Sequence, residues 1–109
     1  MNEIRNSVTY KKVTMKSEYI SEGEYLVASI GNIIVINGVF TTSSKQIGDG
    51  FVIQTGLPTN LARSPIVIIQ KMRGALAWYD CWIVANNLFA SRLPTNTEMR
   101  FTAVYIGRN

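Results

Sequence analysis

The side chains with the clearest chemical potential lie in one apolar segment, Ala75–Val84 (ALAWYDCWIV). Asp80 is the carboxylate of this segment, and Trp78 and Trp82 lie two residues to either side of it. Because residues two apart share a face of an extended strand, both indoles and the carboxylate are expected to point the same way. An aromatic platform beside a hydrogen-bond acceptor is one way to bind a sugar ring. The segment therefore predicts a ligand-binding patch.

Two further residues complete the candidate ligand-binding set. Tyr79 is the alternative aromatic residue on the opposite face, and Arg73 is a hydrogen-bond donor near the same strand. The competing interpretation is structural, because large aromatic side chains dominate cores and interfaces. Asp80 would then cap a turn or pair with an arginine across the sheet or a subunit boundary. In that case the ligand site is expected among loop residues 43–50, 57–64 and 92–98.

Composition excludes most catalytic chemistry. The chain has no histidine, and Cys81 is its single cysteine, expected to be a small buried hydrophobe without reactivity. Zinc clusters of Cys and His ligands, imidazole-based catalysis and an intrachain disulfide are all excluded. Glycosidases need two carboxylates, and no spacing places Glu24, Asp49 or Glu98 beside Asp80. We expect no enzyme activity, no metal site and no cofactor.

Size and charge narrow the class of protein further. The 109 residues (12.2 kDa) suit one domain, 1–109. Eleven Lys and Arg against seven Asp and Glu give a net charge of +4, but most of the cations are scattered singly, so we expect no nucleic-acid partner. The longest apolar runs, Ile33–Ile36 and Ile66–Ile69, are far shorter than the ~18 residues of a membrane helix. No apolar signal region is visible near the first residues, so we expect synthesis in the cytoplasm without a signal peptide.

Short β-branched runs separated by Gly, Asn, Pro and Asp predict an all-β fold. About eight strands at a spacing near ten residues are typical of a sandwich or barrel, here an antiparallel, jelly-roll-like β-sandwich. Turns are expected at Ser21–Gly23, at Gly31–Asn32 and at Asn86–Asn87, and Asn37–Gly38 predicts a bulge or a close backbone approach. The expected strands are Val8–Met15, Glu24–Ile30, Ile33–Thr42, Phe51–Thr55, Pro65–Lys71, Ala75–Val84, Leu88–Ser91 and Met99–Ile106.

Several of these strands are apolar on both faces. Ile33–Ile36 and Ile66–Ile69 do not alternate, and Ala75–Val84 is apolar on either side of Asp80. A small sandwich normally leaves one face of each sheet in water, so a second apolar face predicts a cover. The economical cover is another copy of the chain, in a homotrimer. The alternative is a closed monomeric barrel with surface hydrophobics.

A set of short motifs resembles the C-terminal head, or receptor-binding, modules of tailed-phage and prophage tail fibres and baseplate proteins. In chain order, the motifs are Gly23–Ala28, Gly31–Thr42 (a Gly-Asn hairpin followed by Asn-Gly-Val-Phe), Gly56–Pro58, Ser64–Val67 and Arg100–Ile106 (RFTAVYI). Their order and spacing cover roughly residues 20–107. The chain departs from that pattern because almost no fibre shaft precedes the module.

The resemblance implies a trimeric β-sandwich head that attaches the virion to a host-surface receptor, often a saccharide. It implies a virion location in the tail and contacts with other tail proteins, with residues 1–19 forming an N-terminal strand and a connection to a fibre shaft. The alternative is a purely structural trimerisation, capping or decoration domain that has no ligand of its own. Neither interpretation includes membrane insertion.

Overall fold

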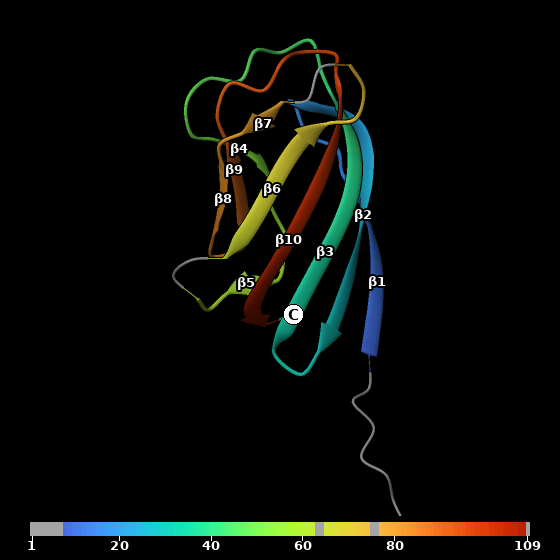
Figure 1. Cartoon of the computed structure of the whole chain (residues 1–109), viewed down its shortest axis with the longest axis vertical. Coiled ribbons are helices and arrows are strands. Elements are labelled where there is room, and N and C mark those ends of the chain that lie inside the picture. Colours follow the sequence, from blue (N-terminus) through green and yellow to red (C-terminus); the bar gives the residue numbers. More distant parts are fainter. Residues whose placement is uncertain (1–7, 63–64, 75–76, 109) are drawn as a thin grey trace, which may run out of the picture.

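A computed structural model of the chain describes residues 8–62, 65–74 and 77–108. All regular structure in these residues is β-strand (Figure 1). The strands are β1 (Val8–Thr14), β2 (Ile20–Ile30), β3 (Ile33–Thr42), β4 (Phe51–Gln54), β5 (Thr59–Asn60), β6 (Ile66–Lys71), β7 (Trp78–Tyr79), β8 (Cys81–Val84), β9 (Asn87–Ala90) and β10 (Glu98–Arg108). The predicted all-β class is therefore confirmed, with ten strands in the described residues in place of about eight.

The strands form two antiparallel sheets. The larger sheet has the order β1-β2-β3-β10-β6-β7, and β5 pairs with the end of β10. The smaller sheet has the order β4-β9-β8. The long strands β2, β3 and β10 form the centre of the larger sheet, and the smaller sheet covers part of one of its faces (Figure 1).

The β2–β3 hairpin shows how sequence sets this framework. Gly31 has a φ of +58°, a value that suits glycine, and it allows a two-residue connection that pairs Ile30 with Ile33. The predicted turn at Gly31–Asn32 is thus confirmed. From this turn the pairing runs without interruption along β3 as far as Thr41, so the hairpin determines the register of the larger sheet.

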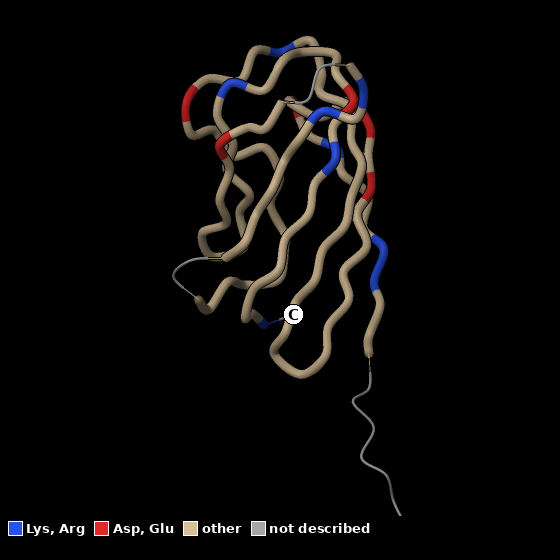
Figure 2. The backbone as a smooth tube through the Cα atoms, in the orientation of Figure 1, with Lys and Arg blue, Asp and Glu red and all other residues tan. Residues whose placement is uncertain are grey.

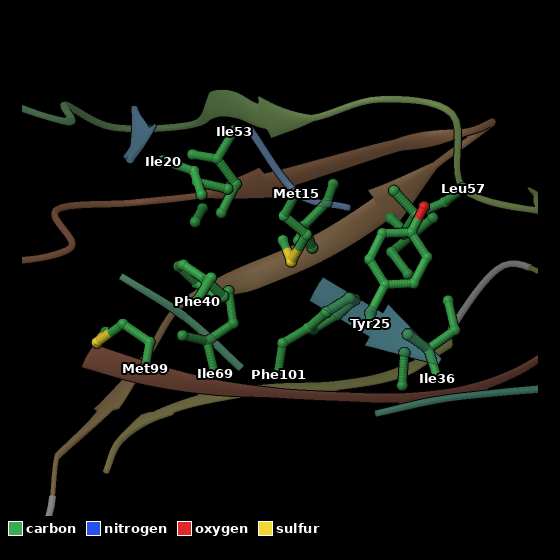
Figure 3. Close-up of a cluster of buried hydrophobic side chains, with 14 of the residues drawn as sticks. Met15, Ile20, Tyr25, Ile36, Phe40, Ile53, Leu57, Ile69, Met99 and Phe101 are labelled. Atoms are coloured by element: carbon green, nitrogen blue, oxygen red, sulfur yellow. The ribbon is translucent and has the colours of Figure 1, made fainter. Parts of the chain in front are cut away.

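The core lies between the two sheets. Its buried side chains come from alternate positions of the long strands and from the smaller sheet, as expected of a two-layer packing. Ile53 of β4 and Ile69 of β6 lie on opposite sides of one cluster, and Tyr25 and Phe101 pack edge to face beside them (Figure 3). The two layers therefore share one hydrophobic core.

The predicted strand Ala75–Val84 is wrong as a single element. Trp78 and Tyr79 pair with β6 in the larger sheet, whereas Cys81–Val84 pair with β9 in the smaller sheet. Asp80 lies at the junction, where the chain passes from one sheet to the other. Ala75 and Leu76, the start of the predicted strand, lie outside the described residues.

Two other local predictions need correction, and a third is confirmed in one of its two forms. The turn expected at Ser21–Gly23 is part of β2, with a register shift between Ile20 and Glu22. The second tight turn is centred one residue earlier than predicted, since β9 begins at Asn87. No bulge occurs at Gly38, but the alternative of a close backbone approach is confirmed, because a Cβ on Gly38 would lie 2.7 Å from the Cβ of Tyr25.

The two apolar runs have the two apolar faces that the sequence predicts, one buried in the core and one exposed. In β3, Ile34 and Ile36 are buried, whereas Ile33 is 48% exposed on the other face. In β6, Ile69 is buried and Ile66 is 61% exposed. These runs read as continuous in sequence because both faces carry apolar side chains, and only one of the two faces is packed within this chain.

Candidate functional site

The residues around the sheet junction line an open cleft. Trp78, Asp80 and Trp82 are exposed, and their alternation with the more buried Tyr79, Cys81 and Ile83 confirms the predicted common face. The cleft has a volume of about 750 Å³, within the ~300–1,000 Å³ range of small-molecule sites. Its lining comprises Asp49, Gly50, Trp78, Tyr79, Asp80, Cys81, Trp82, Ser91 and Arg92.

The two tryptophans are held on rigid strands. Trp78 lies opposite Gln70 of β6 and is 62% exposed. Trp82 lies opposite Phe89 of β9, and their rings are stacked with centroids 5.7 Å apart and planes 6° apart. Trp82 is 37% exposed. The interpretation of these tryptophans as core residues is therefore wrong within this chain.

Backbone packing fixes one edge of the Trp82 ring. A Cβ built on Gly50 would lie 3.5 Å from Cζ2 of Trp82, so the glycine backbone passes close beside the indole. The Gly50 N–H donates a 2.9 Å hydrogen bond to Oγ of Ser91, which joins the loop before β4 to the loop after β9. Ser91 in turn donates its N–H to the carbonyl of Asp80 at 3.0 Å. The aromatic wall and the two loops therefore form one connected unit.

An ion pair between Arg92 and Asp49 borders the cleft. The Arg92 guanidinium donates two hydrogen bonds to Asp49, Nε to Oδ1 at 2.7 Å and Nη2 to Oδ2 at 3.0 Å. The hydrogen bond from Arg92 holds the pKa of the Asp49 carboxyl below its ordinary value, although burial opposes this shift. The same hydrogen bond raises the pKa of Arg92. Both groups are exposed and charged, so each keeps hydrogen-bonding capacity toward solvent or a ligand.

The remaining predicted residues divide between the cleft and other places. Asp80 is exposed, lies between the two tryptophans in sequence and lines the same cleft, and in the described part of the chain it forms neither an ion pair nor a cap to a turn. Tyr79 is half-buried against the core and contributes to the cleft lining. Arg73 does not line the cleft, and its Nε pairs with Oε1 of Glu98 at 3.2 Å.

Cys81 has the character that its sequence context predicts. It packs against the core, and burial raises the pKa of its thiol to about 11, with a smaller contribution from the charge of Asp80. A thiol with that pKa is almost wholly protonated at neutral pH and is a poor nucleophile. Cys81 therefore shapes the cleft without adding reactivity.

Sequence reasoning missed Asp49, Arg92 and Ser91 as partners of the tryptophans. Asp49 and Arg92 lie 43 residues apart, and two backbone hydrogen bonds bring their loops together. The Arg92 N–H donates to the carbonyl of Gly48 at 3.0 Å, and the Asn96 N–H donates to the carbonyl of Ser43 at 3.1 Å. Both residues fall in the loop ranges 43–50 and 92–98 named as the alternative site. Two of the three alternative loops thus meet the aromatic segment at one cleft, whereas residues 57–62 of the third loop do not line it.

A second hollow, of about 460 Å³, lies on the uncovered face of the larger sheet, beside an ion pair between Lys12 and Glu24 (2.8 Å) and next to Leu26 and Arg100. Its only aromatic lining residue, Tyr25, is buried beneath the sheet, so it lacks an exposed ring for stacking. Across residues 8–62, 65–74 and 77–108, no three His, Cys, Asp or Glu side chains gather closely enough to hold a metal ion. Nor do those ranges contain a helix with the length and apolarity to cross a membrane. The cleft at the sheet junction is therefore the better candidate site.

No family model matches this chain, and no curated protein or solved structure is significantly similar to it.

Proposed function

We propose that this chain is a head domain of a phage tail fibre or baseplate that attaches to a host-surface saccharide through the cleft at the sheet junction. The observation that carries the proposal is the pair of exposed indoles of Trp78 and Trp82 on either side of the Asp80 carboxylate. Indole faces suit the apolar face of a sugar ring, and the carboxylate accepts hydrogen bonds from its hydroxyls.

The polar groups bordering the cleft support the same ligand class. Asp49 can accept and Arg92 can donate hydrogen bonds, and their mutual bidentate pair holds both side chains in place before a ligand arrives. A neutral, hydroxyl-rich ligand uses both kinds of group, whereas a strongly charged one would meet the opposite charge beside its own. A cleft of about 750 Å³ has room for one or two sugar units.

The wider assignment rests on the resemblance of the sequence motifs to phage head modules. It includes a trimeric, jelly-roll-like sandwich, a location in the virion tail, contacts with other tail proteins and the absence of enzyme activity. The two antiparallel sheets with one shared core are compatible with such a module. Binding without catalysis predicts that reducing-end release from host polysaccharide stays at the blank rate.

The test is to replace each tryptophan and to measure attachment. Trp78→Ala and Trp82→Ala should each weaken binding to host cell-wall glycan about tenfold or more, since removing an anchoring aromatic residue costs upwards of ~1.4 kcal/mol. Val84→Ala is the matched control, because Val84 is 54% exposed on the same strand as Trp82 but does not line the cleft. Binding is measured by adsorption of the labelled protein to host cells and on a glycan array.

Circular dichroism and native mass separate loss of a contact from loss of the fold. Weaker adsorption with unchanged spectrum and mass supports the site. Unchanged adsorption by both tryptophan variants would overturn it.

A purely structural role is the second candidate, and the large apolar area on the uncovered face of the larger sheet favours it. A trimerisation or capping domain would keep its native mass and would bind no glycan on the array, in the wild-type protein as in the variants. The array result for the wild type therefore decides between the two functions.

A further inference from the structure

The uncovered face of the larger sheet has two complete rows of apolar side chains. The strand register places the members of each row side by side across the sheet. The first row crosses four strands and comprises Val8, Ile30, Ile33 and Ile106. The second row crosses five strands and comprises Tyr10, Ala28, Val35, Val104 and Ile66. These nine residues are called the apolar rows below.

Polarity rises along the same face toward the cleft. The next row contains Lys12 and Asn37 as well as Leu26, and the row after it contains Glu24 and Arg100. Trp78 belongs to this last row through its pairing with Gln70. Figure 2 shows the resulting division, with most charged residues gathered at the end of the molecule where the loops lie. The apolar rows and the cleft therefore occupy opposite ends.

The exposed area of the apolar rows is too large for scattered surface hydrophobics. Tyr10 and Ile66 are more than 60% exposed, and Ile33 and Ile106 nearly half exposed. With typical residue areas the rows expose on the order of 600 Å², at the top of the range for monomer patches and approaching the ~800 Å² per partner of a standard interface. Such a surface indicates an interaction site.

Its shape and charge match a second copy of the chain. The valine, isoleucine and alanine side chains of the apolar rows are of the same types as those that pack between the two sheets of this fold. Copies with a net charge of +4 repel one another, so a contact between them favours a surface without cations; the nine residues of the apolar rows include none, and the cations Lys12 and Arg108 lie at their two borders. At their border the charge of Lys12 is already paired with Glu24 at 2.8 Å.

We infer that copies of this chain assemble through the apolar rows, which pack face to face around the symmetry axis and leave each cleft open to solvent. Contacts between apolar side chains do not require a particular partner group, so identical copies can bury this face around one axis in a closed cyclic assembly. The expectation of three copies rests on the proposed function. The choice of the contact surface rests on the apolar rows alone. The same surface would explain why β1, with six of its seven residues exposed, stays in the sheet.

The test is the native mass of the purified chain with a charge placed in or outside the rows. Wild type should give a mass near three times 12.2 kDa at micromolar concentration. Val104→Glu should give a monomer, because a carboxylate at the centre of the interface would be buried without a partner. Val84→Glu is the matched control, since Val84 is exposed on the smaller sheet, and its mass should stay that of wild type.

The possible results test the contact surface, the number of copies and the cleft separately. Should Val104→Glu fail to fold by circular dichroism, Ile33→Glu tests the same rows near the hairpin turn. A monomeric wild type, an unchanged mass in the row variant or a monomer in Val84→Glu would overturn the inference. A dimer that Val104→Glu dissociates supports the surface and overturns the number three. Glycan binding by the Val104→Glu monomer, measured separately, reports on the cleft alone.

Discussion

Two tyrosines buried in the same core differ in what their hydroxyl groups find. Tyr105 donates a 2.8 Å hydrogen bond to the carbonyl of Pro58, whereas the Tyr25 hydroxyl has no hydrogen-bond partner among the described residues. Burial raises the pKa of both phenols, so both stay protonated at neutral pH. Their hydroxyls are therefore a natural pair for measuring what a buried hydrogen bond contributes in this fold.

We expect opposite outcomes on removing the two hydroxyls. Tyr105→Phe should lower the free energy of unfolding by about 1–2 kcal/mol, because the Pro58 carbonyl loses its donor inside the protein. Tyr25→Phe should leave that free energy unchanged or raise it slightly, since it removes a hydroxyl that is already unsatisfied. Urea unfolding of both variants measures the difference. Equal destabilisation would show that Tyr25 has a partner, such as a buried water.

At the scale of elements, the β2–β3 pair depends on close contact between its backbones. A Cβ on Gly38 would lie 2.7 Å from Cβ of Tyr25 and 2.9 Å from the carbonyl oxygen of Glu24. Both neighbours belong to the main framework of the adjacent strand, so neither can move aside by a rotamer change. Glycine is required here for space, at a position where its φ is ordinary.

Gly38→Ala should lower the free energy of unfolding by about 2–3 kcal/mol, as overpacking does in a tight core. Gly31→Ala is the matched comparison, because nothing lies within 4 Å of its Cβ and only its φ of +58° opposes the change. That strain costs about 1 kcal/mol. The urea midpoints of the two variants give the comparison. A smaller loss for Gly38→Ala than for Gly31→Ala would contradict the close approach.

The candidate site is formed where the segment 78–84 passes from the larger sheet to the smaller sheet. Because Trp78 pairs in the larger sheet and Trp82 in the smaller sheet, their indoles flank the seam between the layers. Loops from both sides close on this seam through the hydrogen bonds of Ser91. A straight strand would present the same residues on a flat face without a cleft.

At the scale of the whole molecule, most charged residues lie toward the loop end of the long axis (Figure 2), whereas the apolar rows lie on the strands toward the other end. The loop end has the ion pairs Lys45–Glu18, Arg73–Glu98 and Arg92–Asp49, and the opposite end has the apolar rows. All three pairs are exposed, so they add little to stability. This division is the one expected if the proposed assembly uses the apolar rows and the proposed ligand binds in the cleft.

Assembly makes thermal stability depend on concentration. If native copies are held together through the apolar rows, the Tm of the wild type should rise over about a hundredfold increase in protein concentration, because association draws the equilibrium toward the folded chain. The Tm of Val104→Glu should not change. Differential scanning fluorimetry measures both. A wild-type Tm independent of concentration would indicate that each chain folds and stays alone.

Several features of this protein follow from sequence because they depend on neighbours along the chain. The alternation of Trp78, Asp80 and Trp82 sets their common face, and the Gly31–Asn32 turn sets the central hairpin, since both are local effects of strand geometry. The excess of apolar residues on both faces of Ile33–Ile36 is likewise visible in sequence. Which face the chain itself covers is not, because that depends on where the smaller sheet packs.

Only the tertiary structure decided the composition of the site. The bend at Asp80, the separation of Arg73 into a pair with Glu98 and the meeting of Asp49 with Arg92 all arise from contacts between distant segments. Loops 43–50 and 91–97 have no hydrophobic periodicity from which their spatial partners could be predicted. They come together because strands that are far apart in sequence pair and pack around one hydrophobic core, and that packing brings their ends to the same place.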